Sequence, residues 1–282
     1  MSAQIVQSVE EQILFEREGS IAYITFNRPH ARNAITVAGN ERLRKLLDQV
    51  RSDSSIHVLV LRGAGDKAFC SGHDLKENAE LPDVADIHER REETAHEIDL
   101  FMQIWNLPQP VIASISGYCV GLGVALAMVC DYIIASENSR FGEFEVTLGY
   151  APLFAINPWK MAPNRAKELS MFSEAKTAQE MYIYNVVNKV VPQEELDSAT
   201  RAAAKRLSEI DSQTLKTIKY QYNHTYEIMG MQNALLLTQE VYNMHRQSIV
   251  TQMEQFKQST REHGFGGAVK KLEEESGAKY HV

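Results

Sequence analysis

The sequence contains few cysteines and none of the patterns in which cysteine acts as a structural staple. Three cysteines occur among 282 residues, and none belongs to a Cys-x-x-Cys pair or to a cysteine–histidine spacing typical of zinc sites. An odd number of cysteines in a long chain gives no disulfide framework and favours a reducing compartment. Cys119 and Cys130 stand in apolar surroundings and are expected to be core residues. We therefore predict no structural zinc and no other bound metal.

Long hydrophobic runs are also absent. The longest apolar stretch, residues 121–130, is far shorter than the roughly 20 residues that a helix needs to cross a bilayer. Residues 1–11 are polar and acidic, and they lack the basic and apolar regions of a secretory signal and the arginine-rich composition of a transit peptide. We therefore expect a cytoplasmic protein that makes no contact with membranes.

Basic residues are fewer than acidic residues. The 29 Lys and Arg residues are outnumbered by 37 Asp and Glu, which gives a formal net charge of −8. This balance argues against a nucleic acid or a membrane surface as the partner, because both attract basic surfaces. It does not exclude a small anionic ligand, since a local basic loop or a helix N-terminus can hold phosphate whatever the total charge.

The remaining composition is that of a globular chain, with 44% hydrophobic and 23% charged residues. Apolar patterning predicts strands at residues 13–15, 21–26, 58–62, 111–115 and 131–136, with helices at 37–52, 98–107 and from 121 to about 129. The alternation predicts an α/β fold with right-handed crossovers. The charged residues 78–97 lack a clear core face. They are expected to form either a partly helical, mobile flap over a pocket or a solvated surface helix.

From residue 163 onward the pattern becomes mostly helical, and residues 212–282 contain no proline and no strand pattern. This shift places a domain boundary near residue 210. The length agrees with one or two domains on the usual scale of about 100–200 residues each.

Two glycine-containing loops carry the chemical signal. One is Ala68-Phe69-Cys70-Ser71-Gly72-His73-Asp74-Leu75-Lys76, and the other is Ser116-Gly117-Tyr118-Cys119-Val120-Gly121-Leu122-Gly123. Each follows a predicted buried strand, and the second leads directly into a helix whose first N–H groups are unpaired. Together they could aim two backbone N–H donors at one oxygen, as in an oxyanion hole. Taken alone, the second loop is equally well explained by a tight strand-to-helix turn.

Together with Asn27-Arg28-Pro29…Asn33-Ala34 and Phe141-Gly142-Glu143-Phe144-Glu145, these loops resemble the crotonase (enoyl-CoA hydratase/isomerase) superfamily. The motifs occur in the family's order between residues 13 and 191. The resemblance implies a crotonase-like spiral core of ββα units over residues 1–210 and an α-helical C-terminal trimerisation region over residues 211–282. It further implies a homotrimer or hexamer and an acyl-CoA thioester substrate. Coenzyme A is then part of the substrate, and no separate cofactor is expected.

The resemblance also implies a set of site residues. The backbone N–H groups of His73 and Leu122 would hold the enolate oxygen of the thioester. His30, Arg32 and Lys76 would supply positive charge for the ADP phosphates. The positions that correspond to the family's substrate and CoA contacts are His30, Ala31, Arg32, Ser71, Asp74, Leu75, Lys76 and Gly121.

The acid/base groups depart from the family pattern. Family hydratases use two glutamates, and the first of these positions holds Ala125 in this chain. The second corresponds to Glu145, whose pKa burial would raise toward neutrality. In an extended segment Glu143 would point to the same side as Glu145 and serve as a second acid/base; the alternative is a solvated or ion-paired carboxylate at the rim. Tyr150 is a further candidate to replace the missing glutamate.

These features predict an enzyme of fatty acid metabolism, either an enoyl-CoA hydratase (a lyase) or an enoyl-CoA isomerase, with Glu145 as acid/base. One carboxylate suits isomerisation, whereas hydration needs a second group to position water. Decarboxylation and hydrolysis remain open, as does the acyl group, although Leu153 and Phe154 are expected to narrow its pocket. The alternative from another class is a catalytically degenerate protein of the same fold that binds CoA thioesters or serves assembly.

Overall fold

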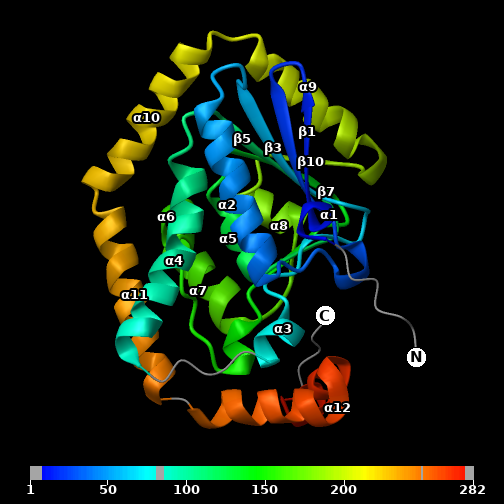
Figure 1. Cartoon of the computed structure of the whole chain (residues 1–282), viewed down its shortest axis with the longest axis vertical. Helices are drawn as coiled ribbons and strands as arrows, with labels where there is room; N and C mark the ends of the chain where they lie inside the picture. Colours follow the sequence, from blue (N-terminus) through cyan, green and yellow to red (C-terminus); the bar gives the residue numbers. More distant parts are fainter. Residues whose placement is uncertain (1–7, 81–85, 249, 277–282) are drawn as a thin grey trace.

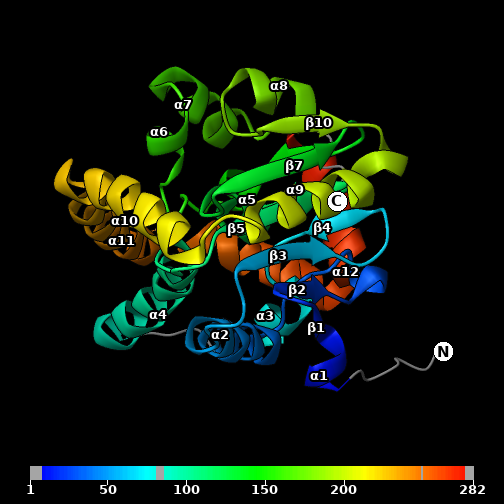
Figure 2. The ribbon, with the colours of Figure 1, turned by 90° about the horizontal axis from the view of Figure 1, so that it is seen from above.

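The computed structural model describes residues 8–80, 86–248 and 250–276 (Figure 1). A six-stranded sheet lies at its centre, in the order β1-β2-β3-β5-β7-β10. Strand β1 pairs antiparallel with β2, and the other neighbours are parallel. Figure 2 shows these strands fanned in this order. Their bounds are Ile13–Glu18 (β1), Ile21–Phe26 (β2), Val58–Gly63 (β3), Val111–Ile115 (β5), Tyr132–Ser136 (β7) and Lys189–Val191 (β10).

Short strands form a second sheet, in the order β4-β6-β8-β9. Its strands are Ala68–Cys70 (β4), Tyr118–Val120 (β6), Arg140–Gly142 (β8) and Lys176–Thr177 (β9). Each of the first three follows a long strand of the large sheet, so the chain repeats a long strand, a short strand and a helical segment. This repeat confirms the predicted α/β fold of ββα units. Residues 68–70, which the sequence indicated as part of a loop, form β4.

The long strands are apolar because both of their faces are covered. Every residue of β2 and β5 is buried, as are the first four residues of β3. Helix α2 (Val37–Ser52) packs its predicted apolar face, Leu43, Leu46, Leu47 and Val50, into the same core. The three cysteines are free and buried, which confirms the prediction that Cys119 and Cys130 are core residues.

Helix α4 corrects the prediction for residues 78–97. It is one continuous helix, Ile87–Trp105, that includes both part of the charged stretch and the separately predicted helix at 98–107. Its buried positions begin at Thr94, whose hydroxyl accepts hydrogen bonds from Gln239 and Asn243 of α11 (Met231–Ser248) at 3.0 and 3.1 Å. Among the described residues of the charged stretch only Thr94 is buried, and residues 88, 89, 91–93, 95 and 96 are exposed, as in the predicted surface-helix alternative. Part of the predicted flap, residues 81–85, lies outside the described residues.

The C-terminal part consists of helices that wrap around the core. Figure 1 shows α10 (Ser212–Ile228) and α11 running along one side of it and α12 (Val250–Ser276) crossing beneath α3 (Leu75–Glu80). Helix α12 is kinked at Gly264, where φ is 70° and ψ is 165°. None of the helices in the described ranges is both long and apolar enough to cross a bilayer. The remaining helices are α1 (Val9–Gln12), α5 (Leu122–Met128), α6 (Asn157–Lys160), α7 (Pro163–Phe172), α8 (Ala178–Ile183) and α9 (Leu196–Ser208).

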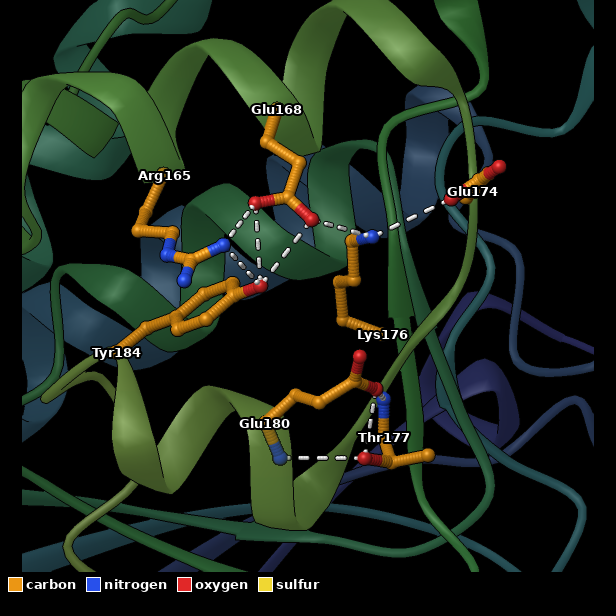
Figure 3. A network of polar contacts seen from close by, with 7 residues as sticks. All are labelled: Arg165, Glu168, Glu174, Lys176, Thr177, Glu180 and Tyr184. Carbon is orange, nitrogen blue, oxygen red and sulfur yellow. Dashed lines mark hydrogen bonds and ion pairs between the residues drawn. The ribbon is translucent and has the colours of Figure 1, made fainter.

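A polar network connects α7, β9 and α8 (Figure 3). The Glu168 carboxylate of α7 accepts from the Arg165 guanidinium at 2.6 Å and pairs with the Lys176 ammonium of β9 at 2.9 Å. The Tyr184 hydroxyl donates to the same carboxylate at 3.2 Å. Helix α8 begins with a capping box between Thr177 and Glu180. These contacts fix α7 against the edge of the small sheet.

Candidate active site

The Asn-Arg-Pro…Asn-Ala segment positions the first glycine loop. The Arg28 guanidinium pairs with the Asp74 carboxylate at 2.8 Å, and both side chains are largely buried. The buried Asn33 amide donates to the carbonyls of Ala64 and Ala68 at 3.0 and 2.7 Å. Its carbonyl accepts from the Arg28 N–H at 3.0 Å. This motif therefore acts as a clamp that holds the segment around residue 74 in place.

The two predicted CoA-binding segments lie side by side. The Ser71 N–H donates to the Arg32 carbonyl at 3.1 Å, and the Arg32 guanidinium lies 5.6 Å from the centre of the Tyr118 ring. His30 and Lys76 are exposed. Leu75 and Gly121 line the cavity described below, whereas the other predicted CoA contacts lie outside its wall. Their part in CoA binding stays a prediction.

The two glycine loops converge at the start of α5. A Cβ built on Gly72 would lie 3.7 Å from the Leu122 nitrogen, and one on Gly123 would lie 2.3 Å from the Cys70 carbonyl oxygen. The Ile35 N–H donates to the Gly72 carbonyl and the Asp74 N–H to the Ile35 carbonyl, so the N–H of His73 faces away from Ile35. Within the part of the chain that the structure describes, neither the His73 N–H nor the Leu122 N–H has an acceptor.

Both loops open into a cavity of about 370 Å³. Its wall draws on the first loop, helices α2, α4, α5, α11 and α12, and the segment around residues 143–154. Its apolar side includes Leu75, Phe101, Ala125, Leu148, Leu153 and Phe154. Its ionisable side chains include His73, Glu93, Glu97, Glu143, Glu145 and Arg246. Leu153 and Phe154 therefore line the pocket as predicted.

Glu145 reaches the N-terminus of α5 across Gly121. The Gly121 N–H donates to the Gly142 carbonyl at 3.0 Å, which aligns β8 with this turn. One carboxylate oxygen of Glu145 would lie 2.5 Å from a Cβ on Gly121, and the other is buried without a hydrogen-bond partner. Burial, reinforced by the negative charge of Glu143, raises the pKa of Glu145 to about 7. Such a carboxyl can both hold and release a proton near neutral pH.

Glu143 and Glu145 line the same cavity, as predicted, but the backbone between them is not the expected one. Strand β8 ends at Gly142 and a 3₁₀ turn begins at Glu145, so the segment is not extended. Glu143 is buried rather than solvated or ion-paired at the rim: its carboxylate accepts from Asn157 at 2.9 and 3.0 Å and from the Ser170 hydroxyl. Burial raises its pKa despite these bonds. Its predicted role as a second acid/base remains untested.

A second ionisable pair, which the motifs did not indicate, stands on the same cavity wall. The imidazole Nε2 of His73 lies 2.8 Å from a carboxylate oxygen of Glu97 on α4. The motifs indicated only the backbone N–H of His73, and Glu97 belongs to the charged stretch that lacks a clear core face in the sequence. The sequence feature that could have indicated Glu97 is the apolar Phe101, which stands one helical turn after it on the same face of α4.

Charge, rather than burial, decides the protonation of this pair. Burial alone would lower the pKa of His73, but the Glu97 carboxylate outweighs it and raises that pKa. Burial alone would raise the pKa of Glu97, but the His73 imidazole, with Arg246 and Arg44 nearby, lowers it. Glu97 is thus held ionised, whereas Glu145 is held close to its point of protonation. Tyr150 also lines the cavity, with the Arg246 guanidinium 5.1 Å from its ring centre.

No group of three or more His, Cys, Asp or Glu side chains within residues 8–80, 86–248 and 250–276 is arranged to hold a metal ion.

The chain is similar to known proteins in both sequence and structure. The family model described as enoyl-CoA hydratase/isomerase matches residues 16–263. The chain is 34% identical over 200 residues to a crotonyl-CoA hydratase of Syntrophomonas wolfei, covering 70% of this chain and 75% of that protein. It is 32% identical over 201 residues to an (E)-benzylidenesuccinyl-CoA hydratase of Thauera aromatica, covering 70% and 76%. The crystal structure of an enoyl-CoA hydratase/isomerase from Xanthobacter autotrophicus Py2 superposes with a TM-score of 0.89 at 30% identity, covering 94% of this chain and 98% of that one.

Proposed function

The chain belongs to the enoyl-CoA hydratase/isomerase (crotonase) family, and from that premise we propose that it adds water to the double bond of an enoyl-CoA thioester. One observation supports this proposal above all. The backbone N–H groups of His73 and Leu122, which have no acceptor among the described residues, lie at the same cavity as Glu145, a buried carboxyl whose pKa is raised. These are the groups that a thioester enolate requires, because its oxygen needs donors and its α-carbon needs a proton.

The N–H groups of His73 and Leu122 form the proposed oxyanion hole. They belong to rigid turns, so they would be aligned before the negative charge develops on the thioester oxygen and would cost no reorganisation. Glu145, protonated for part of the time near pH 7, gives its proton to the α-carbon. The apolar lining raises the carboxyl pKa to the value that this transfer needs.

Coenzyme A is the proposed carrier of the acyl group. The predicted contacts, His30, Ala31, Arg32, Ser71, Asp74, Leu75 and Lys76, lie on two adjoining segments that end beside the cavity. The exposed His30 and Lys76 offer positive charge there. The substrate would then supply coenzyme A, and this chemistry needs no other cofactor.

The first prediction concerns Glu145→Gln. We expect it to lower kcat by at least about 10²-fold, because the amide cannot exchange a proton with carbon. The measurement is mass spectrometry of products from a panel of enoyl-CoAs, in ordinary water and in D₂O. Exposed Glu92 of α4 offers a matched control, Glu92→Gln, which should retain wild-type turnover. Wild-type rates for Glu145→Gln would contradict the proposed role of Glu145.

The same experiment separates the two other candidate functions. Deuterium uptake without the mass of water added would indicate isomerisation, which the apolar Ala125 at the position of the first family glutamate favours. Binding of the CoA thioesters by wild-type protein without any product would indicate a catalytically degenerate binding protein.

We also propose that the helical region over residues 211–282 mediates assembly into a homotrimer or hexamer. Large apolar side chains are exposed on α10 and α11, among them Ile228, Met229, Leu236, Leu237, Val241 and Met244. Exposed apolar side chains gathered on neighbouring helices are typical of an interaction surface.

A further inference from the structure

The proposed hydration leaves one group unaccounted for. Water must lose a proton as it attacks the β-carbon, and Glu145 already supplies a proton to the α-carbon. The position where the family pattern has another glutamate holds Ala125, whose methyl group lines the cavity and cannot take a proton. A second base must therefore come from elsewhere on the cavity wall.

We propose that Glu97, held in place by the His73 imidazole, is this second acid/base and takes the proton from the attacking water. The proposal rests on the proposed hydration and deepens it. Glu97 lies on α4 and shares the cavity wall with Glu145, Leu122 and Ala125. The imidazole that contacts it, at 2.8 Å, belongs to the residue whose backbone N–H faces the enolate oxygen. The Glu97 carboxylate thus contacts the side chain of His73, the residue whose backbone N–H is one of the two proposed oxyanion donors.

The pKa values of the two glutamates support a division of roles. The pKa of Glu145 is raised to about 7 and that of Glu97 is lowered, so near neutral pH one carboxyl can hold a proton while the other is ionised. Environments that push two carboxyl pKa values apart in this way identify an acid and a base.

Glu143, the other candidate carboxylate, is less suited to this step. Both of its oxygens accept hydrogen bonds from Asn157, and one also accepts from Ser170. Burial raises its pKa, which favours the protonated form that cannot accept a proton from water. Its negative charge has a clearer effect on Glu145, whose pKa it raises.

The step balances without any further reactant. The water oxygen forms a bond to the β-carbon while its proton passes to the Glu97 carboxylate. The π electrons of the double bond move to the thioester oxygen at the His73 and Leu122 N–H groups. The enolate then collapses as the α-carbon takes the proton of Glu145. Solvent restores the two carboxyl groups to their starting states.

The test compares two reactions that differ only in their need for water activation. One is hydration of the enoyl-CoA that the wild-type protein turns over fastest. The other is exchange of the α-hydrogen of the corresponding saturated acyl-CoA for deuterium in D₂O, which uses Glu145 and the two N–H donors but no attacking water. The variants are Glu97→Gln, Glu97→Asp and His73→Gln, with Glu92→Gln as the control on the same helix.

We expect Glu97→Gln to lower the kcat of hydration by about 10²-fold or more. Its KM and its α-exchange rate should stay within about threefold of wild type. Glu97→Asp should recover part of the hydration rate, and His73→Gln should lower hydration more than exchange because its backbone N–H is retained.

Hydration by Glu97→Gln within about threefold of wild type would overturn the role of Glu97, and so would an equal loss of both reactions, since a merely structural residue affects both. A wild-type protein that exchanges the α-hydrogen but hydrates nothing would instead refute the proposed hydration, and with it this inference.

Discussion

At Gly121 the lack of a side chain lets a carboxylate approach the end of a helix. The residue has φ 56° and ψ −120°, which few residues other than glycine adopt, and a carboxylate oxygen of Glu145 occupies the space of a Cβ. The same backbone fixes where the Leu122 N–H points. Backbone conformation and acid/base placement are therefore coupled at one residue.

We expect Gly121→Ala to lower kcat/KM by about 10²-fold or more, because displacement of Glu145 by even an ångström misaligns the proton transfer. Gly230→Ala is the matched control: Gly230 also has a positive φ, 100°, but a Cβ there meets nothing within 4 Å. It should cost about 1–2 kcal/mol of stability and leave turnover unchanged. Enzyme kinetics with circular dichroism check both variants, and an active, well-folded Gly121→Ala would refute the coupling.

Glu145 should also lower stability above neutral pH. Its pKa is about 7 in the folded chain against 4.5 for the free group, so its favourable contribution is complete below pH 4.5 and is lost as pH rises through 7. Glu145→Gln should therefore match wild type near pH 4.5 and be more stable at pH 8, by on the order of 2 kcal/mol. Urea denaturation at the two pH values measures this, with Glu92→Gln as the control. An equal effect at both pH values would contradict the raised pKa.

The sequence motifs predicted only some of the residues of the candidate active site. They placed Glu145 and the two glycine loops, because each lies within a short, ordered sequence pattern. They could not indicate Glu97, which meets His73 from 24 positions away through the packing of α4. They placed Glu143 beside Glu145 but could not indicate its burial, because its carboxylate is bound by Asn157 and Ser170, which lie further along the chain.

Among the elements, the predicted strands and helices were most accurate where burial is apolar. The long strands and α2 show clear periodicities because they pack on the hydrophobic core. Helix α4 did not, since Thr94 meets Gln239 and Asn243 of α11 through hydrogen bonds. A helix face covered by polar partners has the sequence pattern of a solvated one. Strand β4 was not predicted, because its three residues are too few to show an alternation of apolar and polar side chains.

The network between α7, β9 and α8 should make the stability of the protein depend on pH through Glu168. The contacts of Glu168 with Lys176 and Arg165 lower its pKa to about 2, from 4.5. Its stabilising effect is thus complete above pH 4.5 and lost as pH falls through 2. Glu168→Gln should lower the Tm by a few degrees at pH 7, with the difference shrinking as pH falls toward 2.

Thermal melting monitored by circular dichroism over pH 2–7 checks this expectation. Glu174→Gln is the matched control, because Glu174 is exposed and pairs with the same Lys176 ammonium at a longer distance, 3.4 Å (Figure 3). Its Tm should stay near wild type. A Glu168→Gln protein that melts like wild type at pH 7 would mean that the network does not hold α7.

For the whole molecule, the proposed assembly can be tested on α11. Leu237, Val241 and Met244 are 66%, 53% and 67% exposed and lie on one face at helical spacing. We expect the wild-type protein to have the mass of three or six chains in light scattering. Leu237→Glu with Met244→Glu should shift it to smaller species, because burying two carboxylates in an apolar interface is costly. Ile183→Glu, at an exposed position of α8, should leave the mass unchanged, and a monomeric wild type would refute the assembly.

The boundary near residue 210 follows from composition, and the break between α9 and α10 lies there. Composition could not indicate that the helices beyond it help to form the cavity. Tyr242 and Arg246 of α11 and Phe256, Lys257 and Thr260 of α12 line it together with the loops of the core. The tail therefore does more than the sequence pattern suggested.

This shared wall joins two properties that are usually considered separately. The segment with the exposed apolar faces of α10 and α11 also shapes the space available to the acyl chain. If the proposed assembly and substrate site are right, a chimaera that carried a relative's residues in place of 211–282 should change both substrate range and quaternary structure. On the same proposals, substitutions in this tail of the protein should alter chain-length preference and assembly state together.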